Sequence, residues 1–294
     1  MPDEKYFDWA RRRAIGEADG CPFEEWPDRQ GAKLFALHPN GFRVFLPPEA
    51  LEASDEYGAG DPYSVETHID NAFHRRRFQC TLELLKLRSP REAQAWRILD
   101  LGCGEGHITA EMKKSYPRAE VSGLDYAISA IRTAAERHKD IDFIVADAYD
   151  APYAPNYFDV IVCNNLWEHV PDPLRFLRGA SRILKPGGAL IISTPSRYRL
   201  ENLLRVLRGK PVRFMSRLHV TEYSVGQVTE QLRHGGFLLA RTYSTPLDDQ
   251  SAGSLKQWVA LRIVQPVVRL FLRSVGSHHC LESTVFYLAE KKEA

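Results

Sequence analysis

From residue 95 onward, the chain alternates short apolar runs with longer stretches in which apolar residues recur every three or four positions. The short runs predict strands, whereas the longer stretches, such as residues 127–139 and 174–184, predict helices. Strands that alternate with helices in this way are typical of α/β proteins, in which helices cover both faces of a parallel sheet. The predicted parallel strands are residues 97–101, 120–124, 142–145, 160–163 and 189–193.

The first 92 residues follow a different pattern and are predicted to form an N-terminal extension. Alternation at residues 33–38 and 42–46, joined by "PNG", predicts a small β-hairpin. Residues 64–87 predict a helix that precedes the first strand of the sheet and folds over the binding site as a lid. The apolar positions of this helix are Ile69, Phe73, Phe78, Leu82 and Leu85.

A glycine-rich turn, "LGCGEG", ends the first predicted strand of the sheet. Its glycines, Gly102, Gly104 and Gly106, indicate a backbone with positive φ or room for a ligand, because glycine costs roughly 0.5–1 kcal/mol relative to alanine in regular structure. Parallel sheets bind ligands at the carboxyl ends of their strands, where this turn lies. The dinucleotide fingerprint G-x-G-x-x-G needs a glycine at position 107, where the chain has His107, so the spacing here is G-x-G-x-G.

This spacing, with Asp100 two residues before the first glycine, resembles motif I of the class I S-adenosylmethionine-dependent methyltransferases. Four later segments resemble the same family in order and spacing: "VSGLDYA", "VADAYD", "FDVIVCNNLWEHVPDP" and "LKPGGALIISTP". The resemblance implies a Rossmann-like sheet, mostly parallel with a terminal antiparallel strand, and S-adenosylmethionine as cofactor. The segments "GFLLARTYS" and "STVFYLAEKK" fit the antiparallel end, although about 40 residues separate them.

The same resemblance divides the chain near residue 92. Residues 1–92 are the predicted extension with its lid helix, and residues 93–294 are the predicted S-adenosylmethionine-binding methyltransferase domain. The lid would bring Tyr63, Arg75 or Arg76 to the methionine carboxylate, with a solvated basic face as the alternative. Two segments fall outside the family pattern and are predicted insertions, residues 196–218 and 246–282.

The cofactor-binding residues follow from the family motifs. The resemblance implies that Asp125 accepts hydrogen bonds from both ribose hydroxyls, and that Asp147 and Ala148 contact the adenine. The alternative for Asp125 is a helix cap, and the alternative for Asp147 is an ordinary loop acid. The full set of predicted cofactor-binding residues is Asp100, Gly102, Cys103, Gly104, Gly106, Asp125, Tyr126, Asp147, Ala148 and Asn164.

Two further motifs bear on the methyl acceptor. The segments "LWEHVPDP" and "LHVTEYS" resemble the small-molecule O-methyltransferases of quinone biosynthesis, which implies methyl transfer to a small or lipid-like molecule, at oxygen. A base assists methylation of a hydroxyl, and histidine is the usual choice. His169 and His219 are therefore the predicted catalytic residues, with a purely structural role as the alternative for each.

Other functions stay open at this point: a methyltransferase acting on RNA or protein, a cofactor-binding module without catalysis, and a nicotinamide oxidoreductase. The loop after the fourth strand is "NNLW", whereas enzymes that methylate amino groups of bases resemble [DN]-P-P-[YF]. With 39 basic and 38 acidic residues the net charge is +1, so nucleic acid is not an expected partner. His278, His279 and Cys280 lack further ligands at suitable spacing, so no metal site is predicted.

The cysteines and the N-terminus predict a cytoplasmic protein. Five widely spaced cysteines include no CxxC pair, which favours a reducing compartment. The segment "MPDEKYFDWARRR" lacks the apolar run of a signal peptide, and no apolar run reaches the ~18 residues of a membrane span.

Two basic segments predict peripheral contact with a membrane. Residues 196–217 carry seven lysines and arginines against the single acid Glu201. In residues 254–275 the polar side chains share one helical face beside a wide apolar face, and Pro266 would kink or divide this helix. This combination suits the headgroup boundary of an anionic bilayer. The alternative is that the second segment packs on the protein itself or on a second subunit, as in a homodimer.

Overall fold

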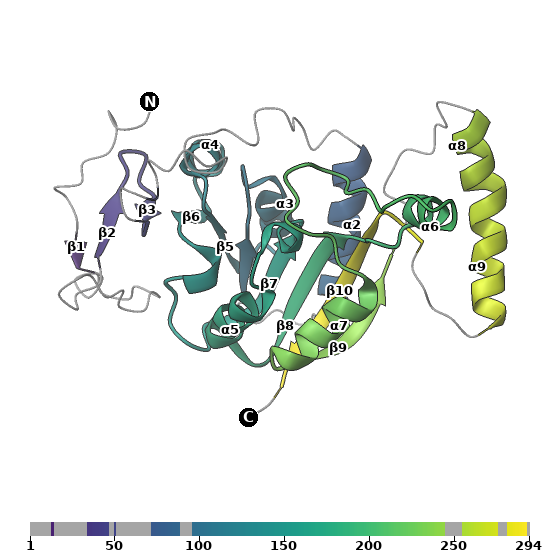
Figure 1. The fold of residues 1–294 in the computed structure, drawn as a ribbon. Coiled ribbons are helices and arrows are strands. Elements are labelled where there is room, and N and C mark those ends of the chain that lie inside the picture. The colour runs from purple at the N-terminus through teal and green to yellow at the C-terminus, as the bar shows by residue number, and fades with distance from the viewer. Residues whose placement is uncertain are drawn as a thin grey trace.

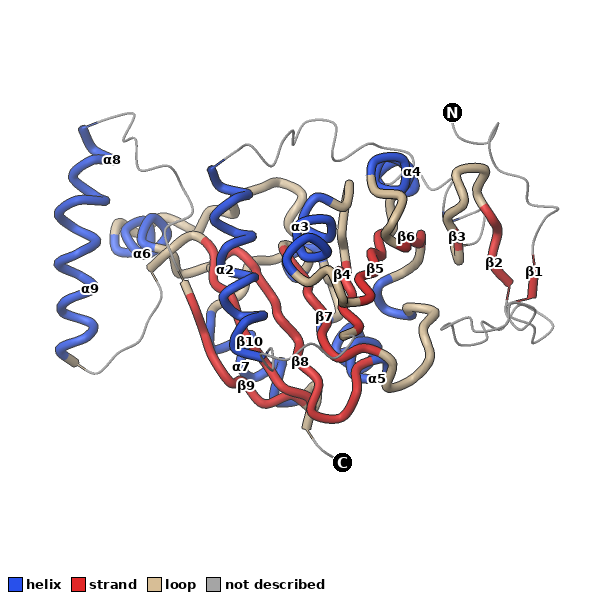
Figure 2. The backbone as a smooth tube through the Cα atoms, turned by 180° about the vertical axis from the view of Figure 1, so that it is seen from behind, coloured by secondary structure: helices blue, strands red, loops and turns tan. Residues whose placement is uncertain are grey.

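The computed structural model describes one mixed β-sheet with helices on both faces (Figures 1 and 2). The described residues are 13–14, 34–46, 50, 72–88, 96–244, 255–275 and 281–292. The strands are β1 (Arg13–Ala14), β2 (Leu34–Leu37), β3 (Arg43–Val44), β4 (Arg97–Leu101), β5 (Glu120–Asp125), β6 (Asp142–Val145), β7 (Phe158–Asn164), β8 (Leu184–Pro195), β9 (Phe237–Tyr243) and β10 (Thr284–Lys291). The helices are α2 (Ala72–Arg88), α3 (His107–Ser115), α4 (Ile128–Arg137), η4 (Ala148–Asp150), η5 (Trp167–His169), α5 (Pro173–Ile183), α6 (Leu200–Leu207), α7 (Val225–His234), α8 (Leu255–Val259), η6 (Ala260–Val264) and α9 (Gln265–Ser274).

The strand order confirms the predicted fold class. Within the described residues it is β1-β2-β3-β6-β5-β4-β7-β8-β10-β9. From β3 to β8 in this order each pair of neighbouring strands is parallel, whereas β2 is antiparallel to β3, and β10 is antiparallel to both β8 and β9. Strand β8 begins five residues before the predicted start at 189, because Leu184 already pairs with Phe158 ahead of a register shift.

The apolar faces of the helices cover the two sides of the sheet. On one side, α5 and α7 bury Phe176, Leu177 and Leu232. On the other side, α2 and α3 bury Leu84 and Met112. Figure 1 shows α5 and α7 in front of the strands, and Figure 2, seen from behind, shows α2 and α3 in front. The predicted helices 127–139 and 174–184 are confirmed as α4 and α5, with ends that differ by one or two residues.

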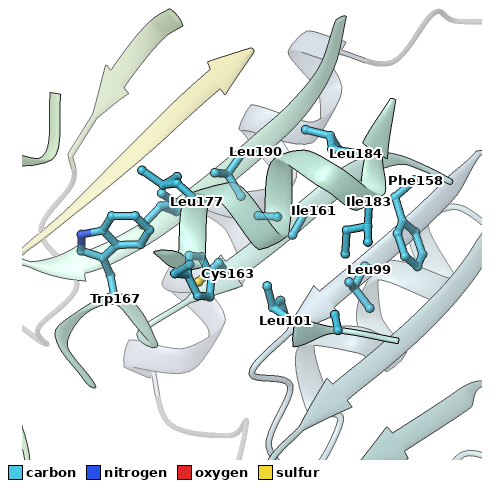
Figure 3. Packing of buried hydrophobic residues seen from close by; sticks show 14 of the residues in the cluster. Leu99, Leu101, Phe158, Ile161, Cys163, Trp167, Leu177, Ile183, Leu184 and Leu190 are labelled. Atoms are coloured by element: carbon cyan, nitrogen blue, oxygen red, sulfur yellow. The ribbon is translucent and has the colours of Figure 1, made fainter. Parts of the chain in front are cut away.

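The largest core cluster lies between α5 and the strands (Figure 3). Trp167 is fully buried there, and its indole Nε1 donates a hydrogen bond to Oε1 of Gln231 at 3.1 Å. Its ring stands edge-on to Phe176, with centroids 5.4 Å apart. Because Trp167 opens η5, this packing fixes the short helix that follows the end of β7.

The predicted N-terminal hairpin is present and extends the sheet. Strands β2 and β3 pair in antiparallel fashion, with Ala36 opposite Val44. Strand β3 also pairs with β6 in parallel, and Arg43 and Asp142 form an ion pair across this boundary, 2.6 Å from Nη2 to Oδ2. The extension therefore adds strands to the sheet edge, a pairing that the sequence did not predict.

Helix α2 is described from residue 72 to 88, so only part of the helix predicted over residues 64–87 can be compared. Leu84 and Leu85 are almost fully buried in the core on one side of the sheet. This half of α2 packs into the core of the sheet. The lid prediction stays open for the earlier part, where Arg75 is exposed and Arg76 is half-buried, while Tyr63 lies outside the described residues.

Both predicted insertions lie beyond the β9 and β10 end of the sheet (Figures 1 and 2). The first contains α6, and the second contains α8, the π-helical turn η6 and α9 in direct succession. Pro266 has no amide hydrogen for the carbonyl of residue 262, and the wider π turn immediately before α9 accommodates this loss. Among the described helices, none combines the length and the apolar character that crossing a membrane requires.

Candidate active site at the carboxyl ends of the strands

The glycine-rich turn between β4 and α3 has a defined backbone conformation. Gly102, Gly104 and Gly106 have φ of +80°, +54° and +76°. The Gly102 amide donates to the carbonyl of Leu124 at 2.8 Å, which ties the turn to β5. A Cβ at Gly106 would lie 2.7 Å from Cζ of Phe143, so both the conformation and the available space require glycine there.

Two buried aspartates flank this turn at the ends of β4 and β5. Asp100 accepts a hydrogen bond from the Thr109 hydroxyl at 2.6 Å, and burial raises the pKa of Asp100 to about 6. The carboxylate oxygens of Asp125 accept the backbone amides of Gly104 and Ala127, at 2.8 and 2.9 Å. A carboxylate oxygen can accept more than one hydrogen bond. The capping role and the predicted ribose contact of Asp125 are therefore compatible.

Strand β6 leads into η4, which carries the predicted adenine-binding residues. Asp147 accepts the Tyr149 amide at 2.9 Å and thereby caps η4, in which Ala148 is the first residue. Burial raises the pKa of Asp147, although the Tyr149 amide opposes the shift. The cap is the structural alternative for Asp147, and its contact with adenine stays a prediction. Cys103 and Tyr126 are half-buried against one small core cluster.

Asn164, at the end of β7, carries a buried atom without a hydrogen-bond partner in the described part of the chain. Its Oδ1 accepts the hydroxyls of Ser193 and Thr81, at 2.9 and 3.3 Å. Both hydroxyls also reach another acceptor, Thr81 the carbonyl of Arg77 and Ser193 the Oδ1 of Asn165, so each can also accept a hydrogen bond from the Asn164 amide. Its Nδ2 is buried and has no partner. In this orientation of the amide Nδ2 can donate to a ligand, and in the flipped orientation it donates to the two hydroxyls.

The two predicted bases come together from separate segments. His169 ends η5, whereas His219 lies in the loop before α7, and their ring centroids are 5.1 Å apart at 87°. Burial, together with the nearby His219, lowers the pKa of His169 to about 4. His169 is therefore uncharged at neutral pH and a weak base.

His219 has a buried carboxylate partner. Its Nδ1 lies 3.0 Å from Oε1 of Glu222, which is fully buried. The other oxygen of Glu222 forms an ion pair with the buried Arg199 guanidinium, and the Met215 amide also donates to Glu222. Although burial alone would raise the pKa of Glu222, hydrogen bonds from His219, Met215 and Arg199 lower it. A carboxylate only accepts, so Nδ1 of His219 carries the proton and Nε2 is left as the basic nitrogen.

Glu168, in η5, joins the two histidine-bearing segments. It is 1% exposed and accepts Nδ2 of Asn165 at 3.1 Å and the Thr194 hydroxyl at 3.0 Å. Burial raises the pKa of Glu168 to about 7. Its backbone carbonyl accepts the Val220 amide at 3.0 Å, which ties η5 to the loop that carries His219.

Leu166 places this cluster beside the glycine-rich turn. A Cβ built at Gly102 would lie 3.0 Å from Cδ2 of Leu166, so the segment leading into η5 packs directly on the turn. The ends of β4 and β7 therefore lie side by side. This site lies where parallel sheets bind their ligands.

Three side chains of the cluster also have the spacing of metal ligands. Glu168, His169 and His219 each offer one donor atom, and these atoms lie within 4.8 Å of one another. The absence of a metal site stays a prediction. The segment 278–280, which the sequence did not favour as a metal site, lies outside the described residues.

The sequence did not point to Glu168, Glu222 or Arg199. Glu168 adjoins His169 in "WEHV", and Glu222 follows His219 by three residues in "HVTE". A carboxylate close in sequence to a candidate base is the signal that could have found both. Arg199 was counted with the basic surface, but it is 6% exposed because the fold pairs it with Glu222.

Comparison with known proteins assigns the chain to a family. The family described as "Methyltransferase domain" matches residues 93–257, which is more than half of the chain. The chain belongs to this methyltransferase family. The recognition as a class I S-adenosylmethionine-dependent methyltransferase, the enzyme class and the cofactor are confirmed.

Curated relatives of the methyltransferase have names from quinone biosynthesis. It is 37% identical over 106 residues to a ubiquinone biosynthesis O-methyltransferase of Xanthomonas campestris. The aligned residues cover 34% of this chain and 44% of the relative. It is 38% identical over 99 residues to a ubiquinone/menaquinone biosynthesis C-methyltransferase of Desulfotalea psychrophila, which covers 33% of this chain and 40% of the relative. These matches span less than half of the relatives' own length.

A solved structure shares the fold of the methyltransferase. It comes from the complex between the Haloferax volcanii Trm112 methyltransferase activator and a methyltransferase, with a TM-score of 0.57 and 18% identity. The alignment covers 79% of this chain and 97% of that chain. At this identity the likeness shows the fold alone, and it agrees with the Rossmann-like sheet of the family.

Proposed function

We propose that this methyltransferase transfers the methyl group of S-adenosylmethionine to a hydroxyl oxygen of a small or lipid-like molecule, with His219 as the base. The observation that carries the proposal is the buried Glu222 carboxylate 3.0 Å from Nδ1 of His219. A carboxylate at this position fixes the imidazole tautomer and stabilises the imidazolium that forms when Nε2 takes a proton. Methylation of a carbon or of an ionised acceptor has less need of such a pair.

The residues at the strand ends fit the chemistry of the cofactor. The three glycines of the turn carry no side chains, the Asp125 carboxylate can accept hydrogen bonds from ribose hydroxyls, and the Asn164 amide lies buried at the end of β7. Asp100 suits an ammonium group, and Arg77 on α2 favours the charged form of Asp100. The bound cofactor supplies a methyl group on an electrophilic sulfonium. The protein holds both reactants in line, excludes water and receives the proton of the acceptor.

His169 supports His219 and is not itself the base. A pKa lowered to about 4 makes His169 a poor proton acceptor at neutral pH. Its ring instead stands edge-on to His219 and limits the movement of that ring. Glu168 holds both loops in place through its side chain and its carbonyl group. The two predicted bases thus separate into one base and one supporting residue.

A kinetic comparison of His219→Gln with His169→Gln tests the base. A lost general base lowers kcat by roughly 10²- to 10⁴-fold, so His219→Gln should fall in this range and His169→Gln should lose much less. Both variants should bind S-adenosylhomocysteine as the wild type does. The acceptor is first found with labelled cofactor in lipid, polar and RNA extracts.

The outcomes of that comparison separate the alternatives. If both variants keep nearly the full rate, the enzyme acts by positioning alone and the proposed base is wrong. If the labelled methyl group is recovered on RNA or on protein, the acceptor is RNA or protein and not a small or lipid-like molecule. Cofactor binding without transfer to any extract would leave a non-catalytic module.

Cofactor binding has a separate test in Asp125→Ala. Charge-assisted hydrogen bonds contribute roughly 1.5–3 kcal/mol, so the affinity for S-adenosylhomocysteine should fall about 10- to 150-fold. Glu230→Ala, which removes an exposed carboxylate on α7, is the matched control and should bind normally. Calorimetric titration measures both affinities. An unchanged affinity of Asp125→Ala would remove this residue from the site, and binding of NAD in place of the cofactor would contradict the proposal.

A further inference from the structure

The helical rod made of α8, η6 and α9 turns its polar side toward the protein. Gln265 is 8% exposed, and Arg269 forms an ion pair with Glu282, which is buried beside β10. Glu282 also accepts the Ser244 hydroxyl at 3.0 Å, at the end of β9. The rod is therefore attached through this inward face, where Val264, Val268 and Leu272 are also half-buried beside the polar contacts.

The apolar side of the same rod faces away from the protein. Leu270 is 70% exposed and Phe271 is 62% exposed, about one and a half turns after the inward-facing Gln265 and therefore on the opposite side of the helix. Helices on the surface of a globular protein normally have the opposite orientation, with the apolar stripe against the core. The other exposed apolar residues of the rod and its end are Leu255, Trp258, Val259, Ile263, Val267 and Val275.

Within the described residues, no element covers this apolar side. Figures 1 and 2 show the rod standing apart from the sheet at one end of the molecule, next to α6. Contiguous exposed apolar patches mark surfaces that bind a protein or a membrane. We therefore expect a binding partner on the apolar side of the rod. The nearby charges indicate whether this partner is a protein or a membrane.

The neighbouring first insertion adds exposed apolar and basic side chains. Leu207 at the end of α6 is 82% exposed. Residues 202–221 and 255–275 contain no aspartate or glutamate. The exposed basic residues of the two segments are Arg208, Lys210, Arg213, Arg217 and Arg262.

We propose that the rod docks on the surface of an anionic membrane, with its apolar side in the headgroup boundary. A wide apolar face with the exposed Arg262 and a basic insertion next to it matches anionic lipid, to which each lysine or arginine near the surface adds about 1 kcal/mol of attraction. A second copy of the chain fits less well. In a two-fold symmetric dimer both subunits contribute the same surface patch. The basic segments, which contain no acidic residue, would then face each other and repel.

Membrane docking also brings the candidate active site to the bilayer, a point that rests on the proposed function. Leu218 and Val220 flank His219 in its loop and are 48% and 58% exposed. The same loop follows the exposed basic residues of the first insertion. A lipid-like acceptor would therefore reach His219 from the membrane surface.

Co-sedimentation of the full chain with vesicles tests the docking. Vesicles of phosphatidylcholine with phosphatidylglycerol should retain the protein at low salt, and vesicles of phosphatidylcholine alone should retain less. Leu270→Ser with Phe271→Ser should lower the partition coefficient at least about tenfold, because two exposed apolar side chains no longer enter the boundary. Arg262→Gln should lower it about fivefold and reduce its dependence on salt.

Matched variants keep the test specific. Leu87→Ser removes an exposed leucine on α2 and should bind vesicles as the wild type does. His219→Gln should also bind normally, so a failure of the proposed chemistry is distinguishable from a failure of docking. No binding to anionic vesicles at low salt overturns the proposal, as does an equal loss in Leu87→Ser. A dimer that Leu270→Ser with Phe271→Ser dissociates, without vesicle binding, would assign the apolar side to a second copy.

Discussion

Helices α5 and α9 have similar apolar periodicity and opposite environments. In α5, Phe176 and Leu177 are completely buried against the sheet. In α9, Leu270 and Phe271 are among the most exposed apolar residues of the described chain. The difference lies on the polar side of each helix, because α9 is attached through Arg269 and Gln265. Apolar periodicity thus predicts that a helix forms, whereas the partners of its polar residues decide which face meets the protein.

The largest expected effect comes from the same substitution on the two helices. Phe176→Ala should lower the free energy of unfolding by about 3–5 kcal/mol, since it leaves a cavity in the core. Phe271→Ala should change it by less than about 0.5 kcal/mol, since the ring is mostly in water. Denaturant titration of both variants measures the two changes. A large loss in Phe271→Ala would mean that the apolar side of α9 is covered within the chain.

A smaller effect is expected at Glu168, a buried carboxyl group of the sheet body. Burial raises its pKa from 4.5 to about 7, so the folded state binds a proton more tightly than the unfolded state. The resulting stabilisation is complete below pH about 4.5 and is lost as the pH rises through about 7. Relative to Glu168→Gln, the wild type should therefore lose on the order of 3 kcal/mol of unfolding free energy across this window.

The measurement for Glu168 is the unfolding free energy of both proteins at intervals between pH 4.5 and 8. Groups common to both proteins cancel in the difference. Glu201→Gln, which changes an exposed carboxylate on α6, provides the matched comparison and should give a nearly flat difference. A difference that rises with pH would show that Glu168 is stabilised as the anion.

The smallest effect should come from the contact that fixes the orientation of α9. The Arg269 side chain is 37% exposed, so its ion pair with Glu282 contributes only about 1 kcal/mol to global stability. Arg269→Gln should nonetheless release α9 from the sheet. Amide hydrogen exchange should become faster in residues 265–274 and stay unchanged in α5. Arg262→Gln, on the same rod without this contact to Glu282, should leave the exchange of α9 as it is.

The sequence predicted the sheet well because its strands are buried on both faces. Continuous apolar runs and the motif spacing located β4 to β8 closely, and βαβ connectivity required them to be parallel. The pairing of β3 with β6 was not predicted, since a strand of two residues carries no periodicity. For α9 the sequence left two orientations open, with its apolar face toward a membrane or toward the protein, because the choice depends on Glu282, which meets the helix only in the folded chain.

The sequence predicted the positions of the candidate site residues but not their burial or their hydrogen-bond partners. Family motifs located the glycine-rich turn, Asp125 and both histidines by position. The distinction between His169 and His219 needed the structure, because it depends on burial of one ring and on the Glu222 partner of the other. The possible hydrogen-bond partners of the Asn164 amide likewise become visible only when every neighbouring donor and acceptor is placed.

The antiparallel pairing of β9 with β10 makes the second insertion a replaceable part of the enzyme. Tyr243 lies directly opposite Phe286, so the chain leaves the sheet and returns at neighbouring positions. A turn of a few residues can span this distance, and a roughly tenfold shorter connection reduces the entropy cost of closing it by about 2 kcal/mol. The sheet and the candidate site would thus form without the segment between Ser244 and Leu281, whereas Leu281 and Ser283 accept backbone hydrogen bonds from Leu200 and Ser196. Exchanging that one segment would direct the same reaction to a different location in the cell.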